Sequence, residues 1–149
     1  MNNKEIIKYT EIAKKQNLKS VKAYVQGKSK SKYEYLFGIY VNEKNNSKKH
    51  IGNIKLGPIN FKHKFSEISY FIGDKNNWKK GYATEAIRKI CLLSKKRFKL
   101  KKLQAGFNQQ NKGSRKVLKK NNFKLEGVFK SQRIIKNKRF DSYWYGKII

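Results

Sequence analysis

A basic segment with a single glycine lies between a predicted strand and a predicted helix, and residues 78–86 read Trp-Lys-Lys-Gly-Tyr-Ala-Thr-Glu-Ala. The first turn of a helix carries unpaired N–H groups and the positive end of the helix dipole, and both attract phosphate. Gly81 lets the backbone approach a ligand closely, while Lys79 and Lys80 add positive charge. The segment matches neither a Walker loop nor a Gly-x-Gly-x-x-Gly pattern. We therefore expect a phosphate-binding loop of another class.

A second candidate segment, Asn111-Lys-Gly-Ser114, opens another predicted helix. The side chains of Asn111 and Ser114 can hydrogen-bond a ligand, and Asn111 is equally suited to cap the helix that follows. This helix ends at Asn122, and asparagine is the residue after glycine that best tolerates the left-handed conformation at helix ends. Two helix N-termini therefore flank the predicted binding region.

Apolar residues at helical spacing define the helices that must position these segments. Ser20 is the predicted N-cap of a short second helix. The third helix has the clearest apolar stripe, which includes Cys91 and so predicts a buried, unreactive thiol. The predicted helices span residues 2–16, 20–27, 83–98 and 112–120.

Alternating apolar residues predict six strands, of which the last two form a hairpin. Ile51 and Ile54 are an odd number of residues apart, which predicts a bulge at Gly52-Asn53. The order of elements predicts an α+β fold in one domain over residues 1–149, a mixed, mostly antiparallel sheet flanked by helices. The predicted strands span residues 33–41, 50–59, 66–72, 103–107, 123–135 and 139–148.

The sequence holds 38 Lys and Arg against 9 Asp and Glu, so its formal net charge is +29. Only five of these cations are arginine, which leaves 38 − 5 = 33 lysines spread over the whole chain. A nucleic-acid footprint favours the planar arginine fork and gathers on one face. Dispersed lysine instead indicates a compositional bias, from which we expect non-specific attraction to polyanions and steering of anionic ligands.

Several classes of protein are excluded by what the sequence lacks. No apolar run reaches the roughly 18 residues of a membrane span, and the N-terminus has no apolar signal-peptide core. We therefore expect a soluble, cytoplasmic protein that does not bind membranes. One cysteine with two distant histidines, His50 and His63, forms neither an internal disulfide nor a closed zinc site, so no metal is expected.

Four motifs stand in an order that resembles one known family, the GCN5-related N-acetyltransferases (GNAT). The resemblance covers the chain from Tyr33 onward, and within the family it is similar to the ribosomal-protein alanine acetyltransferases and related amino-sugar N-acetyltransferases. It implies a sheet splayed apart between the strands at residues 66–72 and 103–107. The motifs are residues 68–73 (Ile-Ser-Tyr-Phe-Ile-Gly), residues 78–86, Asn111-x-x-Ser114 and Asn122-Phe-x-x-Glu-Gly127.

By this resemblance, acetyl-CoA would lie in the split as co-substrate, with its pyrophosphate on residues 79–84. Backbone N–H groups of Phe71 and Ile72, at a bulged strand end, would polarise the acetyl carbonyl. Lys79 replaces a frequent glycine, and Leu118 stands where many members have a tyrosine acid, so the leaving thiolate would need another proton donor or solvent. The implied cofactor-binding residues are Phe71, Ile72, Lys79, Lys80, Gly81, Tyr82, Ala83, Thr84, Asn111 and Ser114.

Acetyl transfer to an amine needs a proton acceptor, because a free amine is mostly protonated at neutral pH. Glu67, on the strand that borders the split, is the predicted catalytic base, and a surface ion pair with a lysine is an equal alternative for it. Glu85 lies in the first turn of a helix, where stabilisation of the dipole is favoured over catalysis. His63 could relay a proton but is better explained as a solvated loop residue.

The acceptor amine is predicted from residues 50–59, which are similar to family members that acetylate amino groups on nucleotide-activated sugars. The alternatives are the N-terminal amine of a ribosomal or other protein, and a small polyamine-like metabolite. The charge of +29 disfavours cationic polyamines and favours anionic acceptors. A different class of function, a non-enzymatic nucleic-acid-binding domain, would use Tyr143-Trp144-Tyr145 as a stacking platform.

The family begins with a strand that this sequence lacks, because Met1 falls part-way into the first helical region. We therefore expect the first edge strand to be missing from the sheet. An exposed edge presents unpaired N–H and C=O groups, through which the protein could pair with another chain and form an oligomer.

Overall fold

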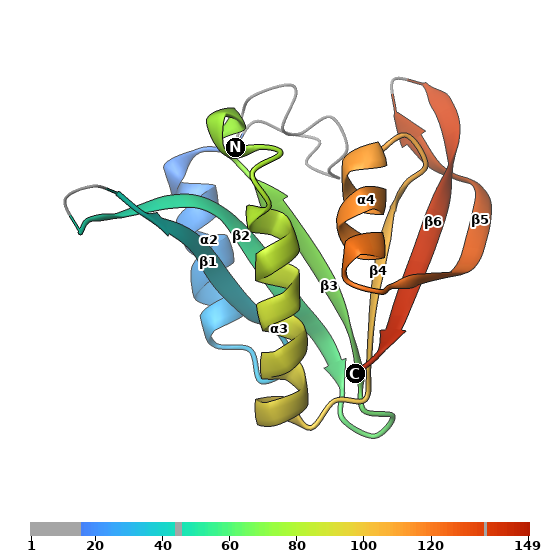
Figure 1. Ribbon diagram of the computed structural model, residues 1–149, viewed down its shortest axis with the longest axis horizontal. Helices are drawn as coiled ribbons and strands as arrows, with labels where there is room; N and C mark the ends of the chain where they lie inside the picture. Colours follow the sequence, from blue (N-terminus) through green and yellow to red (C-terminus); the bar gives the residue numbers. More distant parts are fainter. Residues whose placement is uncertain (1–15, 44–45, 136) are drawn as a thin grey trace.

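Six strands form one sheet in the computed structural model, which describes residues 16–43, 46–135 and 137–149 (Figure 1). Their order is β1-β2-β3-β4-β6-β5, and every neighbouring pair is antiparallel except β3 and β4, which are parallel. The predicted mixed, mostly antiparallel α+β sheet is thus confirmed. The elements are α2 (Leu18–Ser29), β1 (Tyr35–Asn42), β2 (Lys48–Asn60), β3 (Phe65–Ile72), the 3-10 helix η1 (Lys75–Asn77), α3 (Tyr82–Phe98), β4 (Lys102–Asn108), α4 (Lys112–Lys120), β5 (Lys124–Ile135) and β6 (Lys138–Ile148).

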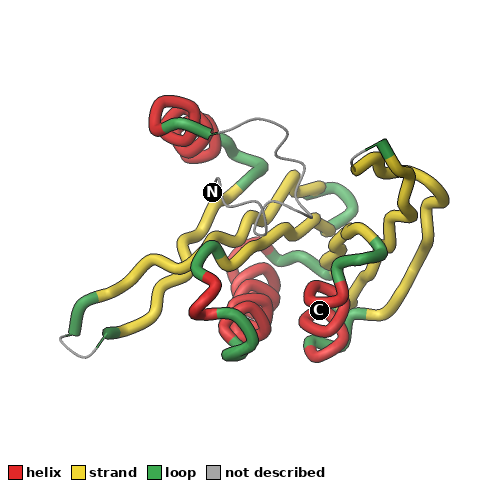
Figure 2. The backbone as a smooth tube through the Cα atoms, turned by 90° about the horizontal axis from the view of Figure 1, so that it is seen from above, coloured by secondary structure: helices red, strands yellow, loops and turns green. Residues whose placement is uncertain are grey.

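The helices cover both sides of the sheet, with α2 on one side and α3 and α4 on the other (Figure 2). The main core lies between the sheet and the α3 and α4 side, where Leu56 of β2 and Leu103 of β4 pack with Ile87 of α3 and Leu118 of α4. All four side chains are 0% exposed, and the burial of each one contributes roughly 1.5–3 kcal/mol to the free energy of unfolding. This packing holds α3 and α4 against the strands that border the split.

The sheet opens between β3 and β4. Only three register pairs join them, Phe65 with Lys102, Ser66 with Leu103 and Glu67 with Gln104. Beyond the third pair the two strands continue without pairing to Ile72 and Asn108, while each stays paired to its outer neighbour. The predicted splay between these strands is confirmed, and Glu67 lies at its narrow end.

The apolar stripe predicted for the third helix is buried in α3, where it comprises Ile87, Ile90, Cys91 and Ser94. Burial also raises the pKa of the Cys91 thiol. A thiol that is 6% exposed with a raised pKa carries little thiolate at neutral pH. The prediction of a buried thiol is confirmed.

Two local predictions were wrong in position. Asn17, not Ser20, is the N-cap of α2, and the two residues form a reciprocal capping box in which Asn17 Oδ1 accepts from the Ser20 N–H at 2.8 Å. The bulge of β2 lies at Ile51 and not at Gly52-Asn53, because β1 pairs with Gly52 and then with His50. The extra residue brings the Ile51 side chain to the buried side of the sheet, at 2% exposure.

The N-terminal predictions fall largely outside the described residues. The helix predicted at residues 2–16 lies outside the described residues except for Gln16. The prediction that the first edge strand is missing is therefore not tested. Within residues 16–34 no strand precedes β1, so in the described part of the chain β1 pairs with β2 alone. None of the helices described is both long and apolar enough to cross a membrane.

Candidate active site

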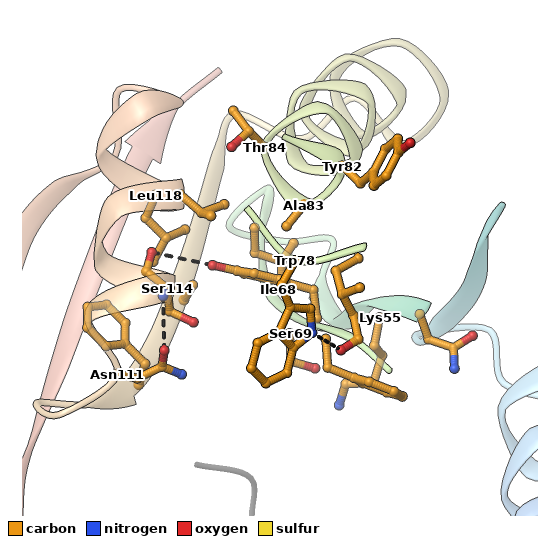
Figure 3. A pocket seen from close by; sticks show the side chains of 18 of the residues that line it. Lys55, Ile68, Ser69, Trp78, Tyr82, Ala83, Thr84, Asn111, Ser114 and Leu118 are labelled. Atoms are coloured by element: carbon orange, nitrogen blue, oxygen red, sulfur yellow. Dashed lines mark hydrogen bonds between the residues drawn. The ribbon is translucent and has the colours of Figure 1, made fainter. Parts of the chain in front are cut away.

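A cleft of about 1850 Å³ opens over the split, with residues from β2, β3, α3, β4, α4 and β6 along its walls (Figure 3). Ten of the eleven predicted site residues line this cleft. Lys80 is exposed and lies outside the lining. The ten are Glu67, Phe71, Ile72, Lys79, Gly81, Tyr82, Ala83, Thr84, Asn111 and Ser114.

The N-terminus of α3 is shaped as an anion cradle. Gly81 is its N-cap in the left-handed conformation, at φ 87°, and no side chain caps the first turn. A Cβ added at Gly81 would meet no atom within 4 Å, so the backbone faces open space. Lys79 is also left-handed, at φ 60°, a conformation that favours glycine. The N–H groups of the first turn are therefore available to a phosphate.

The loop before α3 is tied to the end of β3. The indole Nε1 of Trp78 donates to the carbonyl oxygen of Ile72 at 2.8 Å, as the dashed line in Figure 3 marks. Lys49 pairs with Asp74 at 3.0 Å and lowers the pKa of that carboxyl. These contacts fix the path of the chain from β3 to the cradle at Gly81.

The strand register decides which amides face the split. Gly73 N donates to Ile51 O on β2 at 2.7 Å. Because successive amides of a strand alternate in direction, the N–H of Phe71 also faces β2, whereas the N–H of Ile72 faces the split. The register of β3 with β2 is regular from Ile68 to Ile72, so the predicted bulge at this strand end is absent. Of the two amides predicted to polarise the carbonyl, only that of Ile72 thus faces the split.

The opposite wall is the first half of α4. The Oδ1 atom of Asn111 accepts from the Ser114 N–H at 3.0 Å, so Asn111 is an N-cap, as the sequence allowed. Tyr70 reaches from β3 across to α4, where its hydroxyl donates to Ser114 O at 3.4 Å (Figure 3). Burial raises the pKa of Tyr70 to about 12, so this hydroxyl stays protonated at neutral pH.

The far end of α4 is joined to the cradle by one buried side chain. Asn121 Nδ2 donates to Thr84 O and to Val117 O, both at 3.1 Å. This contact links the first turn of α3 to α4 and fixes the width of the cleft at that end. The Leu118 side chain, 0% exposed, lines the same wall and offers no hydroxyl.

Glu67, the predicted base, lies at the narrow end of the split, in the last register pair between β3 and β4. It is partly buried, and its Oε1 accepts from Gln104 Nε2 on β4 at 3.4 Å. No lysine pairs with it among the ion pairs of the described residues. The two other candidates lie elsewhere: Glu85 is exposed and pairs with Lys89 at 3.0 Å, and His63 is exposed and outside the lining.

The described lining of the cleft is strongly cationic. Glu67 is its single carboxylate, against six lysine and arginine side chains. Of these six residues, only Lys79 was predicted from the sequence. The i, i+4 spacing of Lys116 and Lys120 on a predicted helix was a signal that could have found two more. The six are Lys55, Lys75, Lys79, Lys116, Lys120 and Arg133.

Glu34 connects α2 to the sheet beside the cleft. It forms ion pairs with Lys28 of α2 and with Lys55 of β2, the latter at 3.1 Å, and its side chain is 22% exposed. The hydrogen bond from Lys28 is the main reason why the pKa of Glu34 is lowered. This triad holds the Lys55 side chain at the cleft wall.

Replacing Glu34 by glutamine is expected to reduce the free energy of unfolding at neutral pH by about 1 kcal/mol, because two charge-assisted hydrogen bonds are weakened. A lowered pKa in the folded state means that this contribution is present above the ordinary value of 4.5 and is lost as the pH falls through the folded pKa. Urea unfolding at neutral and acid pH measures both effects. Glu85→Gln is the control. The Glu85 side chain is 53% exposed in its ion pair with Lys89, so the free energy of unfolding should change little.

The splayed sheet with an uncapped helix N-terminus over the split is the fold of known N-acetyltransferases. Spermidine N-acetyltransferase from Vibrio cholerae, solved with CoA and spermine, aligns with a TM-score of 0.86 at 20% identity, over 99% of this chain and 84% of that chain. RimL, a ribosomal L7/L12 α-N-protein acetyltransferase in complex with coenzyme A, aligns with a TM-score of 0.80 at 20% identity, over 90% of this chain and 74% of RimL.

The chain belongs to the acetyltransferase (GNAT) domain family, whose model matches residues 1–124. A relative described as the uncharacterized N-acetyltransferase p20 of Bacillus licheniformis is 28% identical over 95 residues, which are 64% of this chain. The matched part spans 53% of that relative, so the chain corresponds to about half of its length.

Proposed function

We propose that the protein is an acetyl-CoA-dependent N-acetyltransferase whose acceptor is a primary amine on an anionic molecule, a nucleotide-activated amino sugar. Membership of the GNAT family supports acetyl transfer over the alternative of a nucleic-acid-binding domain. The cradle at Gly81 fits a pyrophosphate, because its first-turn amides have no side-chain cap and no atom blocks the approach.

The residues of the cleft have distinct proposed roles. Acetyl-CoA, when bound, supplies the acetyl group as a thioester. The amides of residues 82–84 and the Lys79 ammonium hold the pyrophosphate. The Ile72 N–H, five residues and about 16 Å along β3 from Glu67, donates to the bound cofactor away from the reacting carbonyl. Glu67 accepts a proton from the ammonium form of the acceptor, so that a neutral amine attacks the thioester. With Leu118 apolar, the leaving thiolate takes its proton from solvent or from another donor in the cleft.

The charge of the cleft is the observation that carries the choice of acceptor. Polyamines bear several positive charges and need carboxylates, yet the described lining offers one carboxylate and six cations. Placing a cationic ligand beside cationic side chains makes its binding free energy less favourable by several kcal/mol. Of these cations, Lys79, Lys116 and Lys120 attract the phosphates of a nucleotide-activated sugar, whereas Lys55 is already paired with Glu34. The resemblance of residues 50–59 to sugar-modifying members of the family points the same way.

A panel of acceptors tests this proposal. With acetyl-CoA as donor, a UDP-linked amino sugar is expected to be acetylated with a kcat/KM at least about 100-fold above that of spermidine. Release of coenzyme A, followed with a thiol reagent, measures both rates. Preferred acetylation of spermidine would reject the anionic acceptor. Preferred acetylation of an N-terminal peptide of a ribosomal protein would support the protein-acetylating alternative.

A further inference from the structure

A cluster of hydrogen-bond donors lies on the sheet face opposite α3 and α4. Leu103, Ala105 and Phe107 of β4 point into the core, so the alternate residue Asn108 belongs to the other face. Ser142 of β6 is the register partner of Asn108, and Trp144 follows two residues later on the same face. We call Asn108, Trp144 and Arg133 of β5 the donor cluster, and all three line the cleft.

Two of these donors have no partner among the described residues. Asn108 is 1% exposed, and its Oδ1 accepts from the Gln110 N–H at 2.8 Å, but its buried Nδ2 has no hydrogen bond. The buried Nε1 of Trp144 has none either. Buried N–H groups are nearly always hydrogen-bonded, so two such groups on one cleft wall indicate a ligand that supplies acceptor oxygens.

The cluster offers donors almost exclusively. Amide Nδ2, indole Nε1 and guanidinium groups all donate, and Arg133 Nε already donates to Ser142 Oγ at 3.3 Å. The guanidinium of Arg133 also carries a positive charge. A donor-only, positively charged wall matches the oxygens of a phosphate group.

The position of the cluster relative to Glu67 sets the size of the ligand. Gln104, the partner of Glu67, and Asn108 are four residues apart on β4, which corresponds to about 13 Å of extended chain. An amine at Glu67 and an anionic group at Asn108 are therefore separated by a span that a sugar ring and a diphosphate together cover. Free amino acids are too short to reach both ends.

We propose that Asn108 and Trp144, with Arg133, bind the diphosphate of a nucleoside diphosphate-linked acceptor and so determine acceptor specificity. This assignment rests on the proposed function, since it uses Glu67 to place the amine. The cluster lies on the sheet face opposite the cradle at Gly81. The two phosphate-binding sites are thus separate and can be measured independently.

The test is the affinity for UDP when the cofactor site is saturated with CoA, measured by calorimetry. Asn108→Asp keeps the acceptor for the Gln110 N–H but replaces the donor by a negative oxygen, and is expected to weaken UDP binding at least about tenfold. Trp144→Phe keeps an aromatic ring but removes the N–H, and is expected to weaken UDP binding severalfold. Gln110→Glu is the matched control, because it makes the same amide-to-carboxylate change at an exposed residue outside the lining.

Uridine without phosphates serves as the second probe, and melting temperatures establish that the variants fold. UDP affinity that falls in Asn108→Asp and Trp144→Phe but not in Gln110→Glu, with uridine unaffected, supports the subsite. Equal losses in Asn108→Asp and Gln110→Glu, or equal losses for uridine and UDP, overturn it. Because this readout is binding, a wild type that binds UDP in this way but acetylates no UDP-linked amine leaves the subsite standing and rejects only the proposed function.

Discussion

Aspartate in place of Gly81 is expected to weaken acetyl-CoA binding at least about 100-fold while the protein still folds. The left-handed φ of 87° disfavours any residue with a Cβ by about 1–2 kcal/mol, although Asp tolerates it better than most. The new carboxylate also stands at the uncapped first turn of α3, where it competes for the N–H groups and repels a pyrophosphate. Calorimetric titration with acetyl-CoA measures the loss.

Gly81→Ala separates the two causes, because alanine carries the backbone strain without the charge. No neighbouring atom lies within 4 Å of the added Cβ, so steric overlap contributes nothing in the alanine variant. The strain of about 1–2 kcal/mol is present with and without the ligand, so we expect alanine to lower the melting temperature but to weaken acetyl-CoA binding far less than aspartate does. Retained acetyl-CoA affinity in the aspartate variant would mean that the pyrophosphate does not bind at this helix end.

The elements around the cradle could be predicted from sequence because their signals are local. The α3 stripe from Ile87 to Ser94 repeats at helical spacing, and the turn residues report their own conformations. Asn122, expected to take the left-handed conformation at the end of α4, has φ 62°. Glycine and asparagine tolerate the left-handed conformation that helix ends require, so these residues mark such positions in a single sequence.

The direction of the amides at the end of β3 could not be predicted in the same way. Phe71 and Ile72 are adjacent, large and apolar, so the sequence does not distinguish their backbone amides. Only the Ile72 N–H faces the split. The difference depends on the register with β2, which the contact from Gly73 N to Ile51 O reveals. Register depends on strand pairs that are distant in sequence, and a shift by one residue reverses every direction.

The donor cluster was missed for the same reason. Asn108, Arg133 and Trp144 come from three strands, and nothing in their local sequence relates them. They meet because β4 pairs with β6 and β6 with β5. Net charge was also uninformative by itself, since 33 lysines are dispersed over the chain. What distinguishes the cleft is the balance of six cations against one carboxylate, which only the fold brings together.

Glutamine in place of Glu67 is expected to lower kcat about 10²- to 10³-fold, as the loss of a general base does. The variant keeps the size of the side chain and can still meet Gln104 at the narrow end of the split, so the fold and the affinity for acetyl-CoA should not change. Steady-state rates with saturating acetyl-CoA, beside calorimetric titration of the cofactor, measure the two quantities separately.

A role in proton transfer has a signature that a structural role lacks. As the pH rises towards the pKa of the acceptor amine, more of the amine is already neutral and needs no base, so the defect of Glu67→Gln should shrink. Glu126→Gln is the matched control, because Glu126 pairs with Lys102 at 2.7 Å outside the cleft lining and its loss should leave kcat unchanged at every pH. If Glu67→Gln retains the full wild-type rate at neutral pH, Glu67 takes no part in the reaction. The proton of the amine then leaves through water or through a group other than a carboxylate, because Glu67 is the single carboxylate of the described lining.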